Sequence, residues 1–472
     1  MKTPCIAALL GLVLYGQAAG KAVPTHAIAN LVLGQSDFTT DLSPVTSSFS
    51  QNFPCGVVID PVSRKVFVAD TSNRRVLRYP SVASLSNGSG AEAVFGQARF
   101  STNTSGSGDL GMGRPRGMFF DRLGRLWVAD ETNNRVLMFE AASYRNTQAY
   151  PDRVYGQPDF TTNTSGTAIN KMNGPEGVWV DSDDRLWVSE YFNNRVLWFD
   201  SISTKPSGAD ANGVLGQATF DTSAAGSGSS GLQGPGGIAV SSQGALYVAC
   251  IDAQRVLRFN NAAALGNGAG ANAVLGQPDF ASTTPGLSAT QVARAVGFWI
   301  TPDDTLWVSD QNNNRVLRFD NASNKTNGAA ANGVVGQPGF VTKDSVATNR
   351  SLLGIFFQPF VDAGGNLWIA DSGNDRVLRF PPDVTRPKLK VTSNVPESTS
   401  GKNLTVKGTA SDTYGISKVT YKVNSGSTRI ATGTTSWEFK AALKLGKNTI
   451  TVTAVDSVGN KSVSKVLKIE RD

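Results

Sequence analysis

The sequence predicts an all-β protein in which a six-bladed β-propeller is followed by a small β-sandwich. Three observations lead to this prediction. A unit of about 60 residues recurs six times, all units but the last hold four short apolar segments, and the chain from Arg386 onward differs in charge from the rest. At 472 residues the chain is too long for one ordinary hydrophobic core, so two domains or a repeat array are expected.

The recurring unit is most easily followed by the arginine of its Arg-Val-Leu motif. Successive copies of this arginine are 60, 60, 60, 60 and 61 residues apart. Such regular spacing indicates an array of structural repeats and decides the architecture. The six copies are Arg75, Arg135, Arg195, Arg255, Arg315 and Arg376.

Each of the first five units contains four candidate strands, and the sixth contains the first three. In the first unit they are "PCGVVID", "KVFVAD", "RVLRYP" and "AVFGQ", separated by turns rich in Gly, Asn and Asp. Short segments rich in Val, Leu, Phe and Trp with such turns predict a four-stranded antiparallel meander. Six meanders arranged radially form a β-propeller.

The distribution of the fourth strand indicates how the ring closes. The sixth unit ends at "RVLRFP" without a Gly-Gln strand, whereas an extra copy, "NLVLGQSDF" at residues 30–38, precedes the first unit. We therefore expect the N-terminal strand to complete the last blade. This arrangement joins the two ends of the array and removes its open sheet edges.

The motifs "VADETNNRVLMF" and "PEGVWVD", with their sister copies, resemble those of NHL-repeat propellers over residues 27–381. The resemblance implies the six-bladed fold. It implies less about function, because NHL propellers serve as protein-binding platforms, RNA-binding domains, sensor ectodomains and, in a minority, enzymes.

The N-terminus predicts export. Residues 1–22 combine a positive Lys2, the apolar run "IAALLGLVLYG" and the small-residue exit "QAAGKA", which is the pattern of a secretory signal peptide. We expect a secreted or periplasmic chain with no transmembrane segment after cleavage. Only Cys55 and Cys250 then remain, so packing rather than disulfides must hold the fold.

The C-terminal part is predicted to be a separate module. A linker at residues 382–387 leads to strand-like segments over residues 388–472, which resemble the Ig-like β-sandwich modules of bacterial secreted and surface proteins. From Arg386 onward there are 15 Lys/Arg and 6 Asp/Glu, a net charge of +9, so the preceding 385 residues carry −2. No nucleic-acid partner is expected for the main body. The basic tail is interpreted as a solubilising face, with attraction to anionic envelope polymers as the alternative.

Two sets of recurring residues are interpreted as structural. One aromatic per unit, on the second strand, is expected to pack between sheets. An acid that ends this strand and the arginine that begins the next are expected to fix the turn between them, except in the fourth unit, where Cys250 replaces the acid. The aromatics are Phe67, Trp127, Trp187, Tyr247, Trp307 and Trp368, and the pairs are Asp70–Arg75, Asp130–Arg135, Glu190–Arg195, Asp310–Arg315 and Asp371–Arg376.

Residues that vary between units are the candidates for ligand binding. They lie at the start of the innermost strand and in the turn after the second strand, positions that open on one face of a propeller. The alternative is that these variable residues are merely solvated. The candidates are Arg116, Glu176, Glu131, Tyr191, Phe192 and Asp252.

The predicted function is a monomeric binding or scaffold protein whose ligand is a protein or a cell-envelope polysaccharide. The alternative is a metal-dependent, lactonase-like hydrolase or lyase with a divalent cation in the central channel. The single histidine, His26, lies near the predicted cleavage site, so the mature body lacks the imidazoles of a zinc or iron lyase site. No catalytic residue, required cofactor or protein metal ligand is assigned, and no Cys- and His-rich RING is present to imply ubiquitin-ligase activity.

Overall fold

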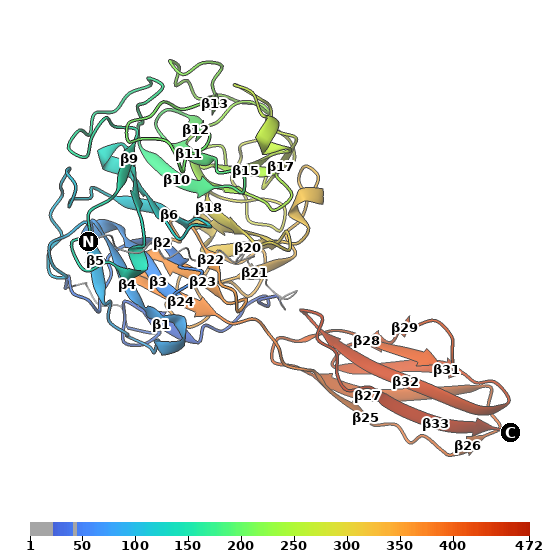
Figure 1. Ribbon diagram of the computed structural model, residues 1–472. Helices are drawn as coiled ribbons and strands as arrows, with labels where there is room; N and C mark the ends of the chain where they lie inside the picture. The colour runs from blue at the N-terminus through green and yellow to red at the C-terminus, as the bar shows by residue number, and fades with distance from the viewer. Residues whose placement is uncertain (1–21, 41–44) are drawn as a thin grey trace, which may run out of the picture. The chain divides into compact units, whose positions relative to one another are not determined.

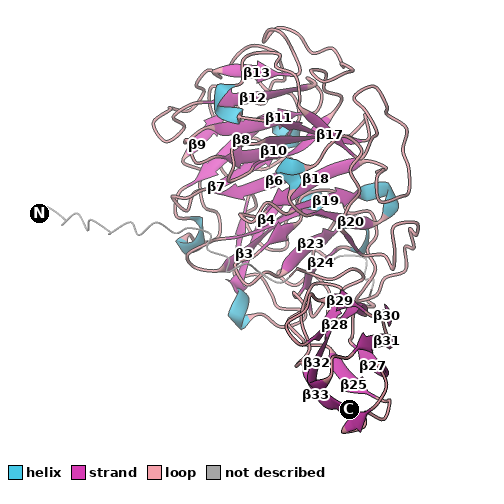
Figure 2. Cartoon of the chain, turned by 90° about the vertical axis from the view of Figure 1, so that its right-hand side faces the viewer, coloured by secondary structure: helices cyan, strands magenta, loops and turns pink. Residues whose placement is uncertain are grey.

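The computed structural model describes residues 22–40 and 45–472. The chain divides into two compact units, one containing Ile28–Phe380 and the other Pro381–Asp472 together with the described part of Ala19–Ala27. Apart from Ala22, the predicted signal peptide lies outside the described residues. Strands and short 3₁₀ turns make up the regular structure of the described chain, as Figures 1 and 2 show. In these residues no helix is long and apolar enough to cross a bilayer.

The described residues of the first unit form six four-stranded antiparallel sheets. Each begins with an innermost strand and continues outward through two middle strands. The innermost strands are β2 (Pro54–Ile59), β6 (Pro115–Phe120), β10 (Pro175–Val180), β14 (Pro235–Val240), β18 (Ala295–Ile300) and β22 (Phe360–Val361). The second strands are β3 (Lys65–Asp70), β7 (Leu126–Asp130), β11 (Leu186–Glu190), β15 (Leu246–Cys250), β19 (Leu306–Asp310) and β23 (Leu367–Asp371).

The outer half of each sheet contains the Arg-Val-Leu strand and a short edge strand. The third strands are β4 (Arg75–Ser81), β8 (Arg135–Phe139), β12 (Arg195–Phe199), β16 (Arg255–Phe259), β20 (Arg315–Phe319) and β24 (Arg376–Phe380). The edge strands are β5 (Ala93–Phe95), β9 (Arg153–Tyr155), β13 (Gly213–Leu215), β17 (Ala273–Leu275), β21 (Gly333–Val335) and β1 (Leu31–Leu33).

The sheets are arranged as a ring. Each innermost strand contacts the next one, from β2 through β6, β10, β14 and β18 to β22, and β2 contacts β23 of the last sheet. Figure 1 shows β2, β6, β10, β18 and β22 near the centre of the unit. Radial four-stranded sheets in a closed ring define a β-propeller.

The last sheet is completed by the N-terminal strand. β1 pairs antiparallel with β24, with Leu31 opposite Arg379 and Leu33 opposite Val377. The seam is also crossed on the inner side, where Ser372 Oγ donates a hydrogen bond to the carbonyl of Pro54 at 2.6 Å. The strand that the sequence places ahead of the first repeat therefore lies in the sheet of the last one.

A tight turn joins the second and third strands of each sheet. In four sheets it is a 3₁₀ turn, and in all six the residue before the third strand has a positive φ, as in Asn134 at 54°. Asn and Asp adopt this left-handed conformation more readily than most residues, which accounts for the Asn-rich motif. These 3₁₀ turns are η1 (Thr71–Asn73), η3 (Glu131–Asn133), η6 (Gln311–Asn313) and η8 (Ser372–Asn374).

Four further 3₁₀ turns follow the third strands. They are η2 (Val82–Ser84), η4 (Ala142–Tyr144), η5 (Ala262–Ala264) and η7 (Ala322–Asn324).

The five predicted acid–arginine pairs are all formed and fully buried, with N–O distances of 2.7 to 3.0 Å. Each arginine also binds loop carbonyls. Arg135 donates to the carbonyl of Phe160 in the following insert and to those of Gly108 and Gly111 in the preceding one. We call each set a framework pair. The arginines hold consecutive inter-sheet loops in place and recur in all six units, and the acids that pair with them recur in every unit but the fourth.

The aromatic residues of the second strands are core residues, as predicted. Trp127, Trp187 and Trp368 are fully buried, and each indole N–H donates to an aspartate at the end of the innermost strand. The glutamine of the Gly-Gln motif has a comparable role. Gln157 Nε2, for example, donates to the carbonyls of Asn134 and Thr164 and so fixes the start of the insert.

The second unit is a sandwich of two sheets around a core that contains Val419, Trp437 and Ile450. One sheet has the order β25 (Lys388–Val391), β27 (Asn403–Ser411), β31 (Ser436–Ala442) and β30 (Thr432–Gly433). The other has the order β26 (Ser398–Thr399), β33 (Lys465–Arg471), β32 (Gly446–Asp456), β28 (Ile416–Val423) and β29 (Arg429–Ile430).

Candidate functional site

The variable residues at the start of the innermost strands gather at one mouth of the propeller. In the first five sheets the pairing register shifts at this point, directly after the residue that begins the strand. In these five sheets the residues at this position are Cys55, Arg116, Glu176, Gly236 and Val296, and in the last sheet Phe356 lies four residues before β22.

Arg116 is the centre of this mouth. Its Nε donates to Glu131 Oε2 at 2.8 Å and lies 3.7 Å from Glu176 Oε2. Its Nη1 lies 3.5 Å from Cys55 Sγ, and its guanidinium lies over the Phe356 ring at 4.6 Å from the centroid. One arginine thus contacts residues from four different sheets.

Two further arginines border the same cluster. Arg114 Nη1 lies 3.6 Å from Glu131 Oε2, and the Arg294 guanidinium lies 5.7 Å from the centroid of the Phe356 ring that Arg116 also covers. Arg294 Nε is buried without a hydrogen-bond partner. We call Arg114, Arg116, Glu131, Glu176, Arg294 and Phe356 the mouth cluster.

Burial changes the acid–base properties of this cluster. It raises the pKa of Glu176 to about 7, and the nearby Arg116 only partly opposes the shift. Glu176 Oε2 is buried and has no hydrogen-bond partner. Burial likewise raises the pKa of the Cys55 thiol, so this cysteine is held as a thiol near neutral pH. A carboxyl group with a pKa near 7 can both donate and accept a proton at neutral pH.

The other three predicted residues lie together in the turns of the third and fourth sheets. Tyr191 Oη donates to Asp252 Oδ1 at 3.0 Å, and burial, aided by this aspartate, raises the Tyr191 pKa to about 12. The Phe192 ring packs edge-on against Tyr191 at 5.1 Å and is 55% exposed. Gly234, with φ of 54°, lies against both Tyr191 and Asp252, leaving no room for a side chain there.

The structure thus divides the six predicted residues. Arg116, Glu131 and Glu176 are buried, with exposures of 3%, 7% and 5%. For these three the alternative of merely solvated loop residues is wrong, because Glu131 binds Arg116 of its own sheet and Arg116 in turn reaches Glu176 of the next sheet. Phe192 and Asp252 are exposed, and Tyr191 is half-buried.

An aromatic cluster across the channel was missed by the sequence analysis. Phe119, Trp179, Trp299 and Phe360 come from four innermost strands and meet with ring-centroid distances of 4.3 to 6.1 Å. All four are at least 93% buried. A cavity of about 110 Å³ lies beside them. In the sequence, the second letter of "MFFD", "VWVD" and "FWIT" is aromatic at the same position of three units. This recurrence could have indicated the cluster, but on its own it predicts only a strand.

The alternative function required a cation in the channel. In the described part of the chain, one group of three acidic side chains is close enough to share an ion, and it belongs to the second unit: Asp383, Asp412 and Asp456. At the mouth, Glu131 and Glu176 are both directed at Arg116.

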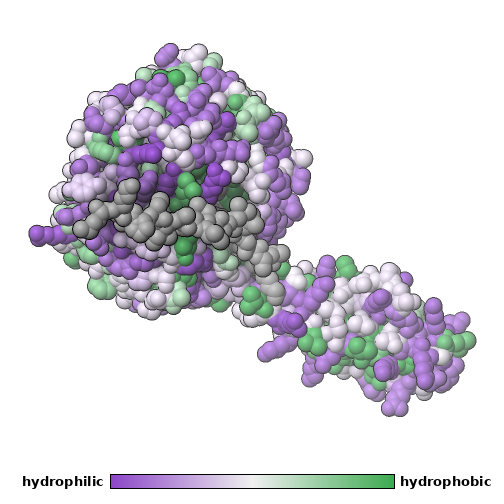
Figure 3. Space-filling model, in the orientation of Figure 1, coloured by the Kyte–Doolittle hydropathy of each residue, from purple (hydrophilic) through white to green (hydrophobic). Residues whose placement is uncertain are grey.

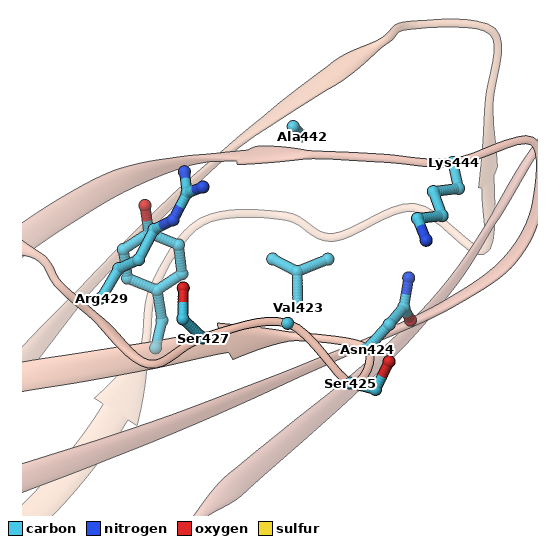
Figure 4. Close-up of a pocket in the computed structure, with 9 residues that line it drawn as sticks. Val423, Asn424, Ser425, Ser427, Arg429, Ala442 and Lys444 are labelled. Carbon is cyan, nitrogen blue, oxygen red and sulfur yellow. The ribbon is translucent and has the colours of Figure 1, made fainter.

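The second unit also has a surface cleft of about 220 Å³. Figure 4 shows Arg429 and Lys444 at its two ends, with Val423 and Asn424 between them. On the visible surface of both units hydrophilic residues predominate and hydrophobic ones are scattered, as Figure 3 shows. Exposed residues of this kind are ordinary for a folded surface.

Comparison with known proteins identifies the second unit but not the chain as a whole. A family model described as a bacterial Ig domain matches residues 387–463. A search of curated proteins gave no significant match.

Solved structures with a similar arrangement are remote in sequence. Virginiamycin B lyase from Staphylococcus aureus is 14% identical, with 69% of this chain and 79% of that chain covered and a TM-score of 0.38. A gluconolactonase from Xanthomonas campestris is 14% identical, with coverages of 77% and 98% and a TM-score of 0.41. PorZ, a surface component of the type-IX secretion system of Porphyromonas gingivalis, is 15% identical, with 89% of this chain but 51% of that chain covered and a TM-score of 0.43. At these values none of them carries an argument about function.

The fold and the family match together define the class of molecule: a β-propeller followed by a bacterial Ig-like domain.

Proposed function

We propose that this chain is an exported binding or scaffold protein in which the loop-rich face of a six-bladed, NHL-type propeller binds a protein or a cell-envelope polysaccharide. The proposal includes a signal peptide at residues 1–22, the propeller at residues 27–381, a linker at residues 382–387 and the Ig-like domain at residues 388–472. It also includes a monomeric state.

The observation that carries the proposal is the arrangement of exposed residues around a rigid mouth. The second residue of the turn after the second strand is exposed in five sheets, where it is Thr132, Phe192, Asp252, Asn312 or Gly373. We call these five the turn ring. Beneath them, the ion pair of Arg116 with Glu131 holds one turn of the mouth, and the buried framework pairs join the two ends of the turn in every sheet but the fourth. Loops presented by a rigid scaffold are the usual location of binding residues.

Within the turn ring, Phe192 and Asp252 are the residues best suited to contact a ligand. An exposed aromatic ring provides a large contact area at low cost in conformational entropy, and the adjacent carboxylate provides directional hydrogen bonds. Because Tyr191 holds both of them, through ring packing and a hydrogen bond, this pair is preorganised.

The test compares the purified full chain with two alanine variants on arrays of envelope polysaccharides and of peptides. Phe192→Ala should weaken binding by about tenfold or more, because it removes a central aromatic contact. Tyr144→Ala is the matched control, since Tyr144 is 72% exposed and lies in η4, outside the turn ring. Saturable binding on one array only identifies the ligand class. Binding that Phe192→Ala leaves unchanged, or no saturable binding on either array, overturns the proposal.

One observation favours the alternative, an enzyme. Glu176 combines deep burial, a pKa raised to about 7 and a carboxylate oxygen that accepts no hydrogen bond, features that cluster at catalytic sites. A hydrolase of the lactonase type could use it as a general acid or base. Hydrolysis of a simple lactone, with Ca²⁺, Mg²⁺ or a chelator present, is the measurement. Activity lost in Glu176→Gln supports the enzyme, whereas a rate equal to the uncatalysed one in all conditions excludes this activity.

A further inference from the structure

Three aspartates from separate segments meet at one place in the second unit. Asp383 precedes β25, Asp412 follows β27, and Asp456 ends β32. One carboxylate oxygen from each lies within 4.8 Å of the others. Asp383 and Asp456 are buried, at 3% and 1% exposure, while Asp412 is half-buried.

Two of the carboxylates use one oxygen to hold their own turn and leave the other without a partner. Asp383 Oδ1 accepts from the backbone N–H and the hydroxyl of Thr385, and Asp456 Oδ1 accepts from the N–H groups of Val458 and Asn460. The Oδ2 atoms of both aspartates are buried and unpartnered. Such buried acceptors are costly unless something satisfies them.

A fourth oxygen, from an uncharged side chain, is also buried without a hydrogen-bond partner. Asn460 is 4% exposed, its Nδ2 donates to the carbonyl of Asp383 at 3.0 Å, and its Oδ1 is buried without a partner. The hydrogen bond anchors this amide beside Asp383, and the backbone N–H of Asn460 anchors it beside Asp456. The amide oxygen is therefore an independent indication that an electron-pair acceptor belongs here.

The charges lead to the same conclusion. No Lys or Arg among the described residues lies within 4.0 Å of these three carboxylates. Arg386 and Lys461 border the neighbouring surface pocket but form no such ion pair. Like charges at this separation repel one another, and a divalent cation would neutralise them.

We propose that Asp383, Asp412, Asp456 and Asn460 form a calcium site in the Ig-like unit. Ca²⁺ binds carboxylate and amide oxygens at about 2.4 Å, so two of its ligands can be at most about 4.8 Å apart, which fits the observed spread. The absence of His or Cys from the group disfavours zinc, and four protein oxygens suit Ca²⁺ better than the strongly hydrated Mg²⁺, which usually keeps several waters. A bound ion would fasten the segment at Asp383 to the two turns.

The test is calorimetric titration of the chelator-treated full chain with CaCl₂. We expect one site with a dissociation constant on the order of 10⁻⁴ to 10⁻³ M, the range of extracellular calcium modules. Asp456→Asn and Asp412→Asn should each weaken binding by about tenfold or more, because each removes a charged ligand. Chemical denaturation of each variant, compared with that of the unmodified chain, checks that it is folded, and half-buried Asp412 is the position best placed to tolerate the change.

Two matched controls locate the site. Glu438→Gln removes an exposed carboxylate of the same unit, and Glu176→Gln removes the buried carboxylate of the mouth cluster. Both should bind Ca²⁺ as the unmodified chain does. The inference is overturned by the absence of saturable heat up to about 10 mM CaCl₂, well above the expected range. It is also overturned if a folded Asp412→Asn variant binds normally, or if Glu176→Gln is the variant that loses binding.

Discussion

Arg255 lies opposite Cys250 at the place where the five other sheets have an arginine and a carboxylate. Both residues are fully buried, and Arg255 Nε has no hydrogen-bond partner. Its other nitrogens keep their loop contacts, donating to the carbonyls of Phe280, Gly228 and Gly231. The fourth sheet therefore keeps the arginine that binds the loops and lacks the carboxylate that would neutralise the charge of this arginine.

Restoring the carboxylate should stabilise the protein. In Cys250→Asp, the new acid would face Arg255 Nε, and a buried charge is far less costly when it is paired and hydrogen-bonded. We expect a gain on the order of 1 kcal/mol in the free energy of unfolding, measured by chemical denaturation. Adding Ala253→Asn, which supplies the amide that Asn133 gives to Asp130, should increase the gain. An unchanged or lower stability in both variants would contradict this account of the fourth sheet.

Because the fourth sheet lacks the carboxylate, removing its arginine should lower the stability of the protein less than removing the arginine of another sheet. Arg315→Met leaves Asp310 buried without its cation, whereas Arg255→Met leaves behind only a thiol. Both variants lose three loop contacts, so the difference between them reports on the stranded carboxylate. We expect Arg315→Met to be less stable than Arg255→Met by about 2 kcal/mol or more. Equal losses would mean that the loop contacts alone account for the recurring arginine.

The sequence predicted those parts of the fold that repeat. Periodic positions such as Trp127 and Arg135 could be assigned because six copies under the same packing constraint reveal what each position must do. The strand at residues 30–38 could be placed for the same reason, since one unit lacked a part that the N-terminus supplied. Repetition thus acted as an internal alignment.

The candidate site could be predicted only as a location. Arg116 and Glu176 were expected at the mouth. Their burial and their contact with each other could not be predicted, because each of these residues occurs at its position in only one unit. Glu131 lies fifteen residues from Arg116 and joins it only because the turn folds back over the innermost strand. The group of Asp383, Asp412 and Asp456 was missed entirely, because no spacing rule relates three turns of a sandwich.

The aromatic cluster predicts a channel closed by packing. Trp299 contacts Trp179 and Phe360, with centroid distances of 5.1 and 4.5 Å, and is 5% exposed. Trp299→Ala should cost about 3 to 5 kcal/mol, the usual loss for a large aromatic in a core, and Trp299→Phe should cost less. Phe49→Ala, at a residue that is 62% exposed, is the surface control. Denaturation followed by tryptophan fluorescence reports on this unit, and a cost no larger than that of Phe49→Ala would show that the cluster does not support the ring.

Glu176 predicts how stability depends on pH. Its pKa is about 7 in the folded protein and about 4.3 in an unfolded chain, so between these values the folded state binds more protons. The stabilising contribution of the protonated carboxyl is therefore fully present below about pH 4.3 and is lost as the pH rises through about 7. Glu190, whose pKa burial also raises to about 7, contributes in the same window.

The melting temperature should fall between about pH 5 and pH 8, since the free energy of unfolding decreases wherever the folded state holds the extra proton. Glu176→Gln cannot ionise and should make this fall shallower, leaving the part due to Glu190 and to the other carboxyls whose pKa burial raises. The exposed Glu140→Gln should reproduce the slope of the unmodified chain. If Glu176→Gln kept the full dependence of melting temperature on pH, Glu176 would not titrate near neutral pH. Its proposed role as a general acid or base would then be wrong as well.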